Sequence, residues 1–160
     1  MKQIFFLRHA NSPWEISGQS DYDRSIDQKG YQEIKSVSAK IISKRLTVEK
    51  VFCSPSKRAS ETSNLIVTDF NCCHRKIEYK DFLYYGSQQD VLNSLARLER
   101  SIDSILIVGH NPMIPELIAL LTGKMLLNYP TCSLALINTN SWTSLRESKL
   151  KFIINSDKLT

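Results

Sequence analysis

Apolar residues along the chain occur in two alternating arrangements, short continuous runs and longer stretches with a period near 3.6 residues. The short runs predict strands at about residues 3–8, 51–53, 77–79, 104–108, 133–138 and 151–154. The periodic stretches predict helices at about residues 27–46, 56–70, 87–98 and 112–122. This alternation is typical of βαβ units. We therefore expect an α/β fold, a three-layer sandwich in which helices flank a mostly parallel central sheet.

The first helix has both a start signal and a periodic apolar face. Asp27 is placed to accept hydrogen bonds from the free backbone amides of the first turn. The apolar positions that follow are Tyr31, Ile34, Ile41 and Ile42. Their spacing predicts that this face packs on the sheet.

Other helix ends are marked by serine, proline and glycine. Ser54 is expected to cap the second helix, with Pro55 at the first helical position, where no backbone donor is needed. Ser87 and Asp90 have the spacing of a capping box. Gly123 is expected to end the helix that begins near Pro112 or Pro115.

Length and composition indicate one globular domain over residues 1–160. Of these residues, 42% are hydrophobic and 23% are charged, as in ordinary folded proteins. Every apolar run is too short to span a membrane, and the first residues lack the long apolar stretch of a secretory signal. We therefore expect a cytoplasmic protein that does not act at a membrane.

Charge and cysteine content exclude several partners. The net charge of +5 comes from basic residues dispersed along the chain, which argues against nucleic acid and suits an anionic substrate. The four cysteines have no zinc-site spacing and are expected to be reduced thiols.

Two histidines stand at the ends of clearly marked strands. His9 follows the run 4–7 and Arg8, and His110 follows the run 104–109. Turn residues come after both. A single strand-end histidine is more often a hydrogen-bonded turn residue. However, the carboxyl ends of neighbouring strands converge on one crevice in an open α/β sheet, so this pair favours a shared site for phosphate.

Arg58 lies in the first turn of the second predicted helix. There the helix dipole and free backbone amides already favour an anion. A guanidinium also binds two phosphoryl oxygens at once, which a lysine cannot do. Taken alone, Arg58 is more readily interpreted as a solvated helix-start residue. We expect it to join the site if strand 51–53 lies beside the first strand.

Three segments carry these groups in order. Residues 7–10 read Leu-Arg-His-Ala, residues 54–62 begin Ser-Pro-Ser-Lys-Arg, and residues 108–112 read Val-Gly-His-Asn-Pro. Together they resemble the histidine phosphatase superfamily, and specifically its small SixA-type phosphohistidine phosphatase branch. The resemblance covers nearly the whole chain and implies a phosphoglycerate mutase-like fold.

The resemblance also implies a role for each residue. His9 would be the nucleophile that forms a covalent phosphohistidine intermediate. Arg8, Arg58 and His110 would be catalytic and bind the phosphoryl oxygens, and Arg24 would be a fourth phosphate contact. No metal and no cofactor are implied, because the arginines supply the positive charge.

One departure from the superfamily pattern bears on the substrate. The wider superfamily has a glutamate or aspartate before the third helix to protonate an alkoxide, and here residues 83–87 read Leu-Tyr-Tyr-Gly-Ser. Loss of a general acid costs ~10²–10⁴-fold in rate with an alcohol leaving group. Imidazole leaves more easily, which favours phosphohistidine, although Asp81 or Asp90 could reach the site. The shortness of the chain predicts an open groove for a histidine on a protein partner.

Two alternatives remain open from the sequence, and the spacing argues against a third. The enzyme could act on a small phosphate ester, or the domain could bind phosphorylated ligands without turnover. Cys53 followed by Arg58 is reminiscent of cysteine-dependent phosphatases, but only four residues separate them where that loop needs five. We expect a monomeric phosphatase that acts on a phosphorylated protein or a small phosphate ester.

Overall fold

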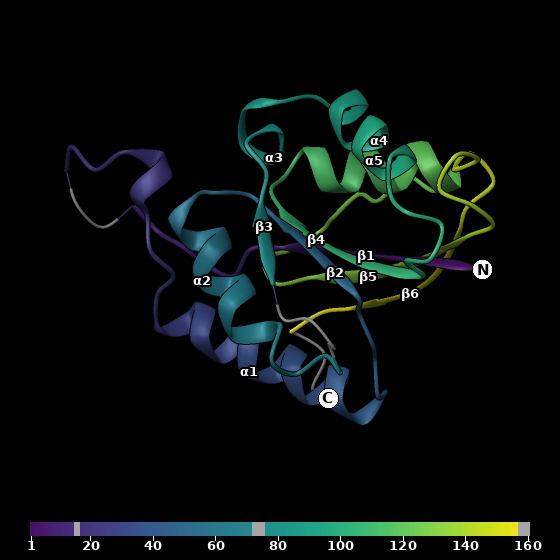
Figure 1. Cartoon of the computed structure of the whole chain (residues 1–160). Helices are drawn as coiled ribbons and strands as arrows, with labels where there is room; N and C mark the ends of the chain where they lie inside the picture. Colours follow the sequence, from purple (N-terminus) through teal and green to yellow (C-terminus); the bar gives the residue numbers. More distant parts are fainter. Residues whose placement is uncertain (15–16, 72–75, 157–160) are drawn as a thin grey trace.

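A six-stranded sheet forms the middle layer of the computed structural model, which describes residues 1–14, 17–71 and 76–156 (Figure 1). The order across the sheet is β3-β2-β4-β1-β5-β6. The strands are β1 (Lys2–Arg8), β2 (Lys50–Cys53), β3 (Ile77–Tyr79), β4 (Ser104–Gly109), β5 (Leu134–Thr139) and β6 (Lys149–Ile154).

The first four strands in that order are parallel, whereas β5 runs antiparallel to both β1 and β6. Every residue of β4 is buried, as the continuous apolar run predicts for a strand covered on both faces. The predicted fold class, a mostly parallel sheet between helical layers, is confirmed.

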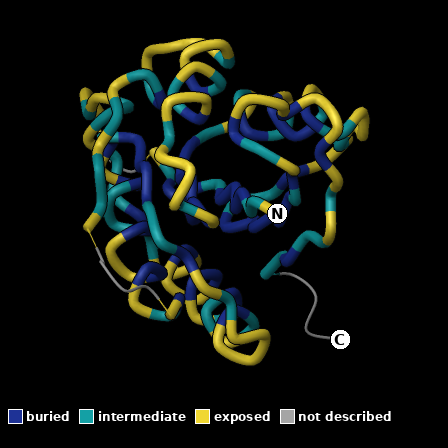
Figure 2. Tube along the Cα trace, turned by 45° about the vertical axis from the view of Figure 1, so that its right-hand side comes forward, coloured by how far each residue is buried: buried dark blue, intermediate teal, exposed yellow. Residues whose placement is uncertain are grey.

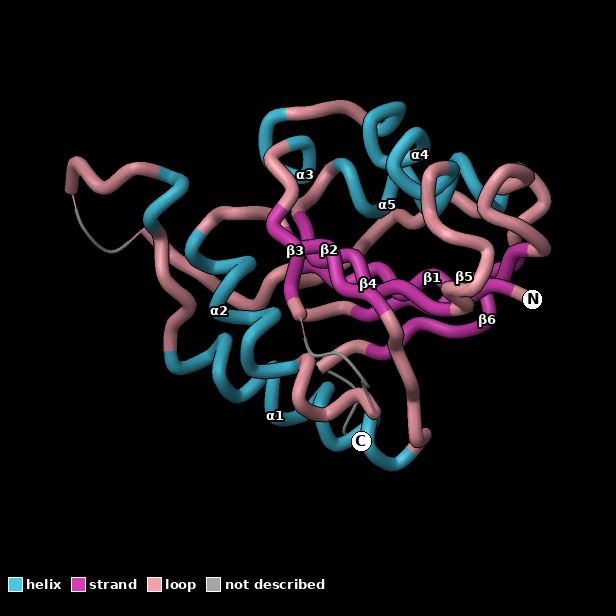
Figure 3. Tube along the Cα trace, viewed as in Figure 1, coloured by secondary structure: helices cyan, strands magenta, loops and turns pink. Residues whose placement is uncertain are grey.

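Helices cover both faces of the sheet (Figures 1 and 3). One face carries α1 (Gln28–Ser43) and α2 (Lys57–Ile66), and the other carries α3 (Phe82–Tyr85), α4 (Gln88–Ala96) and α5 (Met113–Thr122). Side chains alternate along β1: Phe5 and Leu7 join the core under α1 and α2, and Ile4 and Phe6 join the core under α3 to α5. Buried residues therefore gather along the sheet and the inner faces of the helices (Figure 2).

Three of the predicted helix termini are confirmed. The side chain of Asp27 accepts a hydrogen bond from the backbone of Gly30 at 2.8 Å. Ser87 and Asp90 form a reciprocal capping box at the start of α4. Gly123 ends α5 with a left-handed φ of 69°, which glycine adopts without strain.

The prediction that Ser54 caps α2 is wrong. The helix begins at Lys57 with Ser56 as N-cap, and Ser56 makes no side-chain capping bond. The side chain of Ser54 faces His110 instead. The predicted end at Phe70 is also wrong, because α2 ends at Ile66; Phe70 is apolar because it packs edge-on against Phe5 in the core.

The predicted apolar face of α1 is partly wrong. Tyr31 and Ile42 are 49% and 57% exposed. The buried stripe consists instead of Gly30, Glu33, Ile34, Val37 and Ile41. Gly30 belongs to this stripe because a Cβ there would lie 2.6 Å from the Asn11 carbonyl oxygen, so α1 packs closely against the chain that follows β1.

Two short elements lack a periodic signal in the sequence, the 3-10 helix η1 (Asp21–Asp23) and α3. None of the helices in the described residues has both the length and the apolar character required to cross a membrane. Cys53 and Cys132 are buried free thiols, and Cys72 and Cys73 lie outside the described residues.

Candidate active site

The ends of β1 and β4 bring the two histidines together. In the parallel register of these strands Arg8 lies opposite Gly109, so the next residue on each strand is a histidine. The backbone N–H of His9 donates to the carbonyl of Gly109 at 3.1 Å, which extends the pairing by one residue. The two imidazole centroids are 5.1 Å apart.

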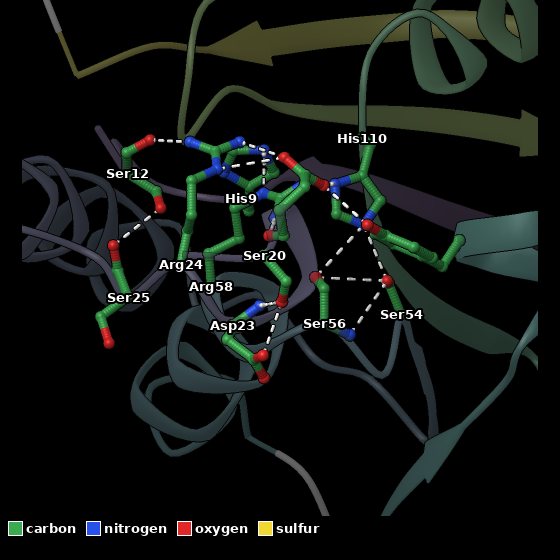
Figure 4. A network of polar contacts seen from close by, with 12 residues as sticks. His9, Ser12, Ser20, Asp23, Arg24, Ser25, Ser54, Ser56, Arg58 and His110 are labelled. Carbon is green, nitrogen blue, oxygen red and sulfur yellow. Dashed lines mark hydrogen bonds and ion pairs between the residues drawn. The ribbon is translucent and has the colours of Figure 1, made fainter. Parts of the chain in front are cut away.

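Arg58 joins this pair from the first turn of α2 (Figure 4). Its Nε donates to Nε2 of His9 at 3.2 Å, and its Nη2 lies 3.3 Å from Nδ1 of His110. Arg58 was expected to join the site if β2 lay beside β1, but β4 separates these two strands. Arg58 still reaches both rings, since α2 starts above the strand ends and the arginine side chain is long.

The hydrogen bonds of His9 define its tautomer. Nδ1 lies 2.7 Å from the carbonyl of Ala10, which only accepts, so the proton is assigned to Nδ1. Nε2 therefore carries the lone pair and accepts from Arg58. Burial lowers the pKa of His9 to about 3, with further lowering from His110, Arg58 and Arg8. The ring is therefore neutral at physiological pH, the form in which an imidazole can act as a nucleophile.

His110 is also neutral. Burial and the charge of Arg58 lower its pKa to about 4, although the carboxylate of Asp21 acts in the opposite direction. Its Nε2 lies 2.7 Å from the hydroxyl of Ser54 and 3.4 Å from that of Ser56. Because the guanidinium of Arg58 only donates, Nδ1 of His110 accepts from it, and the proton is assigned to Nε2, which donates to the hydroxyl of Ser54.

Arg8 ends β1 beside the histidines. Its Nη1 donates to the carbonyl of Tyr129 at 2.9 Å, while its buried Nε has no partner within the part of the chain that the structure describes. The buried carboxylate of Glu33 holds the neighbouring backbone by accepting from the N–H of Asn11 and the hydroxyl of Thr131, both at 2.8 Å. Arg8 therefore keeps one buried donor without a partner in the described residues, next to His9.

The sequence did not point to Asp21, although it lies in the site. Its Oδ2 accepts from Nη2 of Arg58 at 2.9 Å and from the hydroxyl of Tyr84 at 2.7 Å. Partial burial alone would raise the pKa of Asp21, but hydrogen bonds from Tyr84, Arg24 and Arg58 outweigh it and hold the pKa below its usual range. The signal available in the sequence was the three-residue spacing between Asp21 and Arg24, which form an ion pair.

Arg24 is close to the site, but it contacts Asp21 rather than either histidine. Its Nε and Nη2 donate to Oδ1 of Asp21 at 3.0 and 2.8 Å, and its Nη1 donates to the carbonyl of Ser12. The guanidinium also stacks over Trp14, 4.7 Å from the ring centroid. Trp14 is 63% exposed, so this pair lies on the rim of the site.

A cleft of about 830 Å³ runs from Asp21, Arg58 and His110 between α3, α4 and the start of α5. His9 does not line this cleft, because Arg58 covers its Nε2. Asp90 is held in the α4 capping box, and Asp81 is absent from the lining. The lining beyond the charged end consists mainly of Leu83, Tyr84, Gln88, Gln89, Leu92, Met113, Glu116 and Leu120.

Side chains of the types that bind metal ions are not clustered in the described part of the chain. Across residues 1–14, 17–71 and 76–156, no group of three or more histidine, cysteine, aspartate or glutamate side chains could hold a metal ion. The positive charge around the two imidazoles comes from Arg8, Arg58 and Arg24.

The depressed pKa of His9 makes stability depend on pH. An unfolded imidazole gains a proton as the pH falls through about 6.5, whereas folded His9 remains neutral down to about 3. The unfolded state then binds more protons, so we expect the free energy of unfolding to fall by about 2 kcal/mol between pH 7 and pH 5 from His9 alone. Urea unfolding at both pH values measures this. His9→Asn should show a pH dependence weaker by that amount, and an equal pH dependence in both proteins would contradict the assignment.

Comparison with known proteins identifies the family and the fold. The family model of the histidine phosphatase superfamily (branch 1) matches residues 4–83, half of the chain. A phosphohistidine phosphatase SixA homolog of Haemophilus influenzae is 27% identical over 132 residues, covering 76% of this chain and 77% of the relative. An uncharacterized protein of Mycobacterium leprae is 24% identical over 144 residues, covering 82% and 86%.

Among solved structures, the protein histidine phosphatase SixA complexed with tungstate superposes with a TM-score of 0.86. The two chains are 22% identical over 99% of each, so the likeness shows a shared fold. The resemblance seen in the sequence and the matched family model lead to the same assignment: the chain belongs to branch 1 of the histidine phosphatase superfamily.

Proposed function

We propose that this phosphatase removes the phosphoryl group from phosphohistidine on a protein partner, with His9 as the nucleophile. The observation that carries the proposal is the lone pair on Nε2 of a neutral, buried His9, which lies beside His110 and behind Arg58, two residues that line the cleft. A neutral imidazole with an oriented second nitrogen is the form that attacks phosphorus.

The proposed first step is an exchange between two imidazoles. The lone pair of Nε2 of His9 forms a bond to phosphorus, and the P–N bond of the substrate breaks with its electrons going to the leaving ring nitrogen. If the other nitrogen of the substrate ring is protonated, that ring leaves as neutral imidazole. His9 then carries the phosphoryl group on Nε2 and its proton on Nδ1, so the charges balance.

The second step is hydrolysis. A water oxygen bonds to phosphorus, the P–N bond to His9 breaks, and the electron pair returns to Nε2. Dihydrogen phosphate leaves with both protons of the water and ionises in solution. The proton on Nδ1 stays on His9 throughout, bonded to the carbonyl of Ala10.

Positive charge for both steps comes from arginines. In the structure the donors of Arg58 are directed to His9, His110 and Asp21. We propose that they transfer to the phosphoryl oxygens when substrate enters, where they stabilise the charge of the transition state. Arg8 adds the unpartnered Nε donor, and the reaction then needs no metal ion.

The choice of phosphohistidine rests on the leaving group. The carboxylates that line the cleft are Asp21 and Glu116, and segment 83–87 supplies none. Asp21 is held ionised, so it has no proton to give to an alkoxide. The cleft continues past the charged end over apolar and amide side chains, which fits a histidine presented by a folded partner. Tungstate, which the SixA relative binds, is a tetrahedral oxyanion like phosphate.

Turnover of two substrates tests the proposal. We expect kcat/KM for a phosphohistidine-bearing protein to exceed that for an alkyl phosphate by about 10²-fold or more, since the missing acid penalises only the alkyl ester. Steady-state phosphate release, with and without a chelator, measures both values. Equal efficiency on the two substrates would favour a small-molecule phosphomonoesterase, and binding without turnover of either would indicate a phospho-ligand-binding module.

A further inference from the structure

Asp21 occupies the side of the site from which a leaving group must depart. It lines the cleft together with Arg58 and His110, whereas His9 lies behind the guanidinium of Arg58. A phosphoryl group that reaches Nε2 of His9 from the cleft therefore has the nucleophile on its inner side. Because displacement at phosphorus is in line, the leaving group is on the outer side, next to Asp21.

The carboxylate of Asp21 is held firmly in this place. Arg24 binds Oδ1 through two donors, and Tyr84 and Arg58 bind Oδ2. When Arg58 turns its Nη2 to a phosphoryl oxygen, Oδ2 loses one partner and keeps the hydroxyl of Tyr84. The carboxylate then has a free lone pair on the cleft side while Arg24 and Tyr84 still fix its orientation.

We infer that Asp21 accepts a hydrogen bond from the distal ring N–H of the substrate phosphohistidine and thereby selects it over phosphate esters. This inference rests on the proposed function and adds the residue that recognises the leaving group. An ionised carboxylate favours the ring that is protonated on its distal nitrogen. That is the form which leaves as neutral imidazole when the P–N bond breaks.

An ester gains nothing from the same group. Its leaving oxygen carries no N–H, and an ionised carboxylate cannot supply the proton that an alkoxide needs. The carboxylate also lies close to the negative phosphoryl group, which disfavours every substrate unless a cationic leaving group offsets the repulsion. Asp21 therefore gives specificity by an attraction that only a protonated ring can offer.

The charged and titratable groups facing Asp21 are Arg24 after η1, Arg58 on α2, Tyr84 on α3 and His110 after β4. Burial and the contact with Asp21 raise the pKa of Tyr84, so its hydroxyl remains a donor. Across the neutral range only the substrate ring and its phosphoryl group change protonation, so the alkaline limb of the rate profile should report the substrate ring.

The test compares Asp21→Asn with Asp23→Asn, because both carboxylates belong to η1 but Asp23 is exposed and does not line the cleft. Each protein is assayed on a chemically phosphorylated histidine peptide and on p-nitrophenyl phosphate, whose leaving group needs no proton. We expect Asp21→Asn to lower kcat/KM for the peptide by about 10- to 100-fold, the size of one charge-assisted hydrogen bond. Activity on the aryl ester should change less than about threefold, and Asp23→Asn should leave the ratio of the two unchanged.

The pH profile gives a second readout. In the unmodified protein the ionised carboxylate should extend activity on the peptide to higher pH, and Asp21→Asn should move this alkaline limb to lower pH. An equal loss on both substrates with an unmoved limb would show that Asp21 only positions Arg58 and would overturn this inference alone. A wild-type protein that hydrolyses the aryl ester and not the peptide would overturn the proposed function as well.

If Asp21→Asn does not fold, Tyr84→Phe provides a second variant. It should lower the ratio of kcat/KM for the peptide to that for the aryl ester, to a smaller extent than Asp21→Asn. An unchanged ratio would contradict the inference.

Discussion

His9→Ala should lose turnover by roughly 10⁴- to 10⁶-fold while the fold and phosphate binding are retained. The reason is that, in the proposed mechanism, His9 supplies the lone pair that bonds to phosphorus, so the covalent intermediate cannot form without it. Arg8, Arg58 and His110, the proposed ligands of the oxyanion, are unchanged in this variant. Phosphate release measures the first effect, and calorimetric titration with tungstate or phosphate measures the second.

Thermal unfolding of the same variant serves as the control, since His9 is buried and its removal leaves a small cavity. A melting temperature within a few degrees of the unmodified protein would assign the loss to chemistry. Turnover that survives the substitution would mean that His9 is not the nucleophile. The domain would then act through another group.

Arg58→Ala should reduce kcat/KM by about 10²- to 10⁴-fold, the effect of removing a guanidinium from a phosphoryl-transfer site. Arg58 contacts both imidazoles and Asp21, so its loss removes several donors at once. Its charge is also one of the causes that lower the pKa of His9. Burial is the larger cause of the lowered pKa, so His9 should stay neutral at pH 7 in this variant. The loss of activity should therefore come from the missing contacts between Arg58 and the phosphoryl group.

Two further variants make this result specific. Arg58→Lys keeps the charge but lacks the fork of donors, and we expect it to recover only part of the activity. Lys57→Ala removes an exposed cation from the same helical turn and should change kcat/KM less than threefold, because exposed charges contribute little. A similar loss in Lys57→Ala and Arg58→Ala would indicate a general electrostatic effect rather than direct contact.

Most of the fold could be predicted from the sequence because strands and helices bury their apolar faces with different periods. The continuous run of β4 and the capping residues Asp27 and Ser87 carry this signal locally. The order of the strands has no such local signal, because it depends on packing between distant segments. For that reason the sequence did not reveal that β4 lies between β1 and β2, and the short elements η1 and α3 went undetected.

Only part of the site could be predicted from the sequence, because the rest depends on contacts between distant segments. His9 and His110 could be paired because both end strongly marked strands, and Arg58 because it begins a helix. Asp21 lies in a polar segment without periodicity, and its partners come from α2 and α3. Ser54 was misassigned as a helix cap because its preference for capping is local, whereas its bond to His110 is formed across two strand ends.

Phosphorus should become bound to His9 during turnover, and trapping the intermediate would detect this bond. The protein is mixed with a labelled phosphohistidine peptide, quenched in alkali within the first turnover, digested and mapped by mass spectrometry. We predict label on the peptide that contains His9, stable to alkali, lost in acid and missing from His9→Ala. Label on Cys53, or full turnover with no labelled protein at any time, would contradict the mechanism.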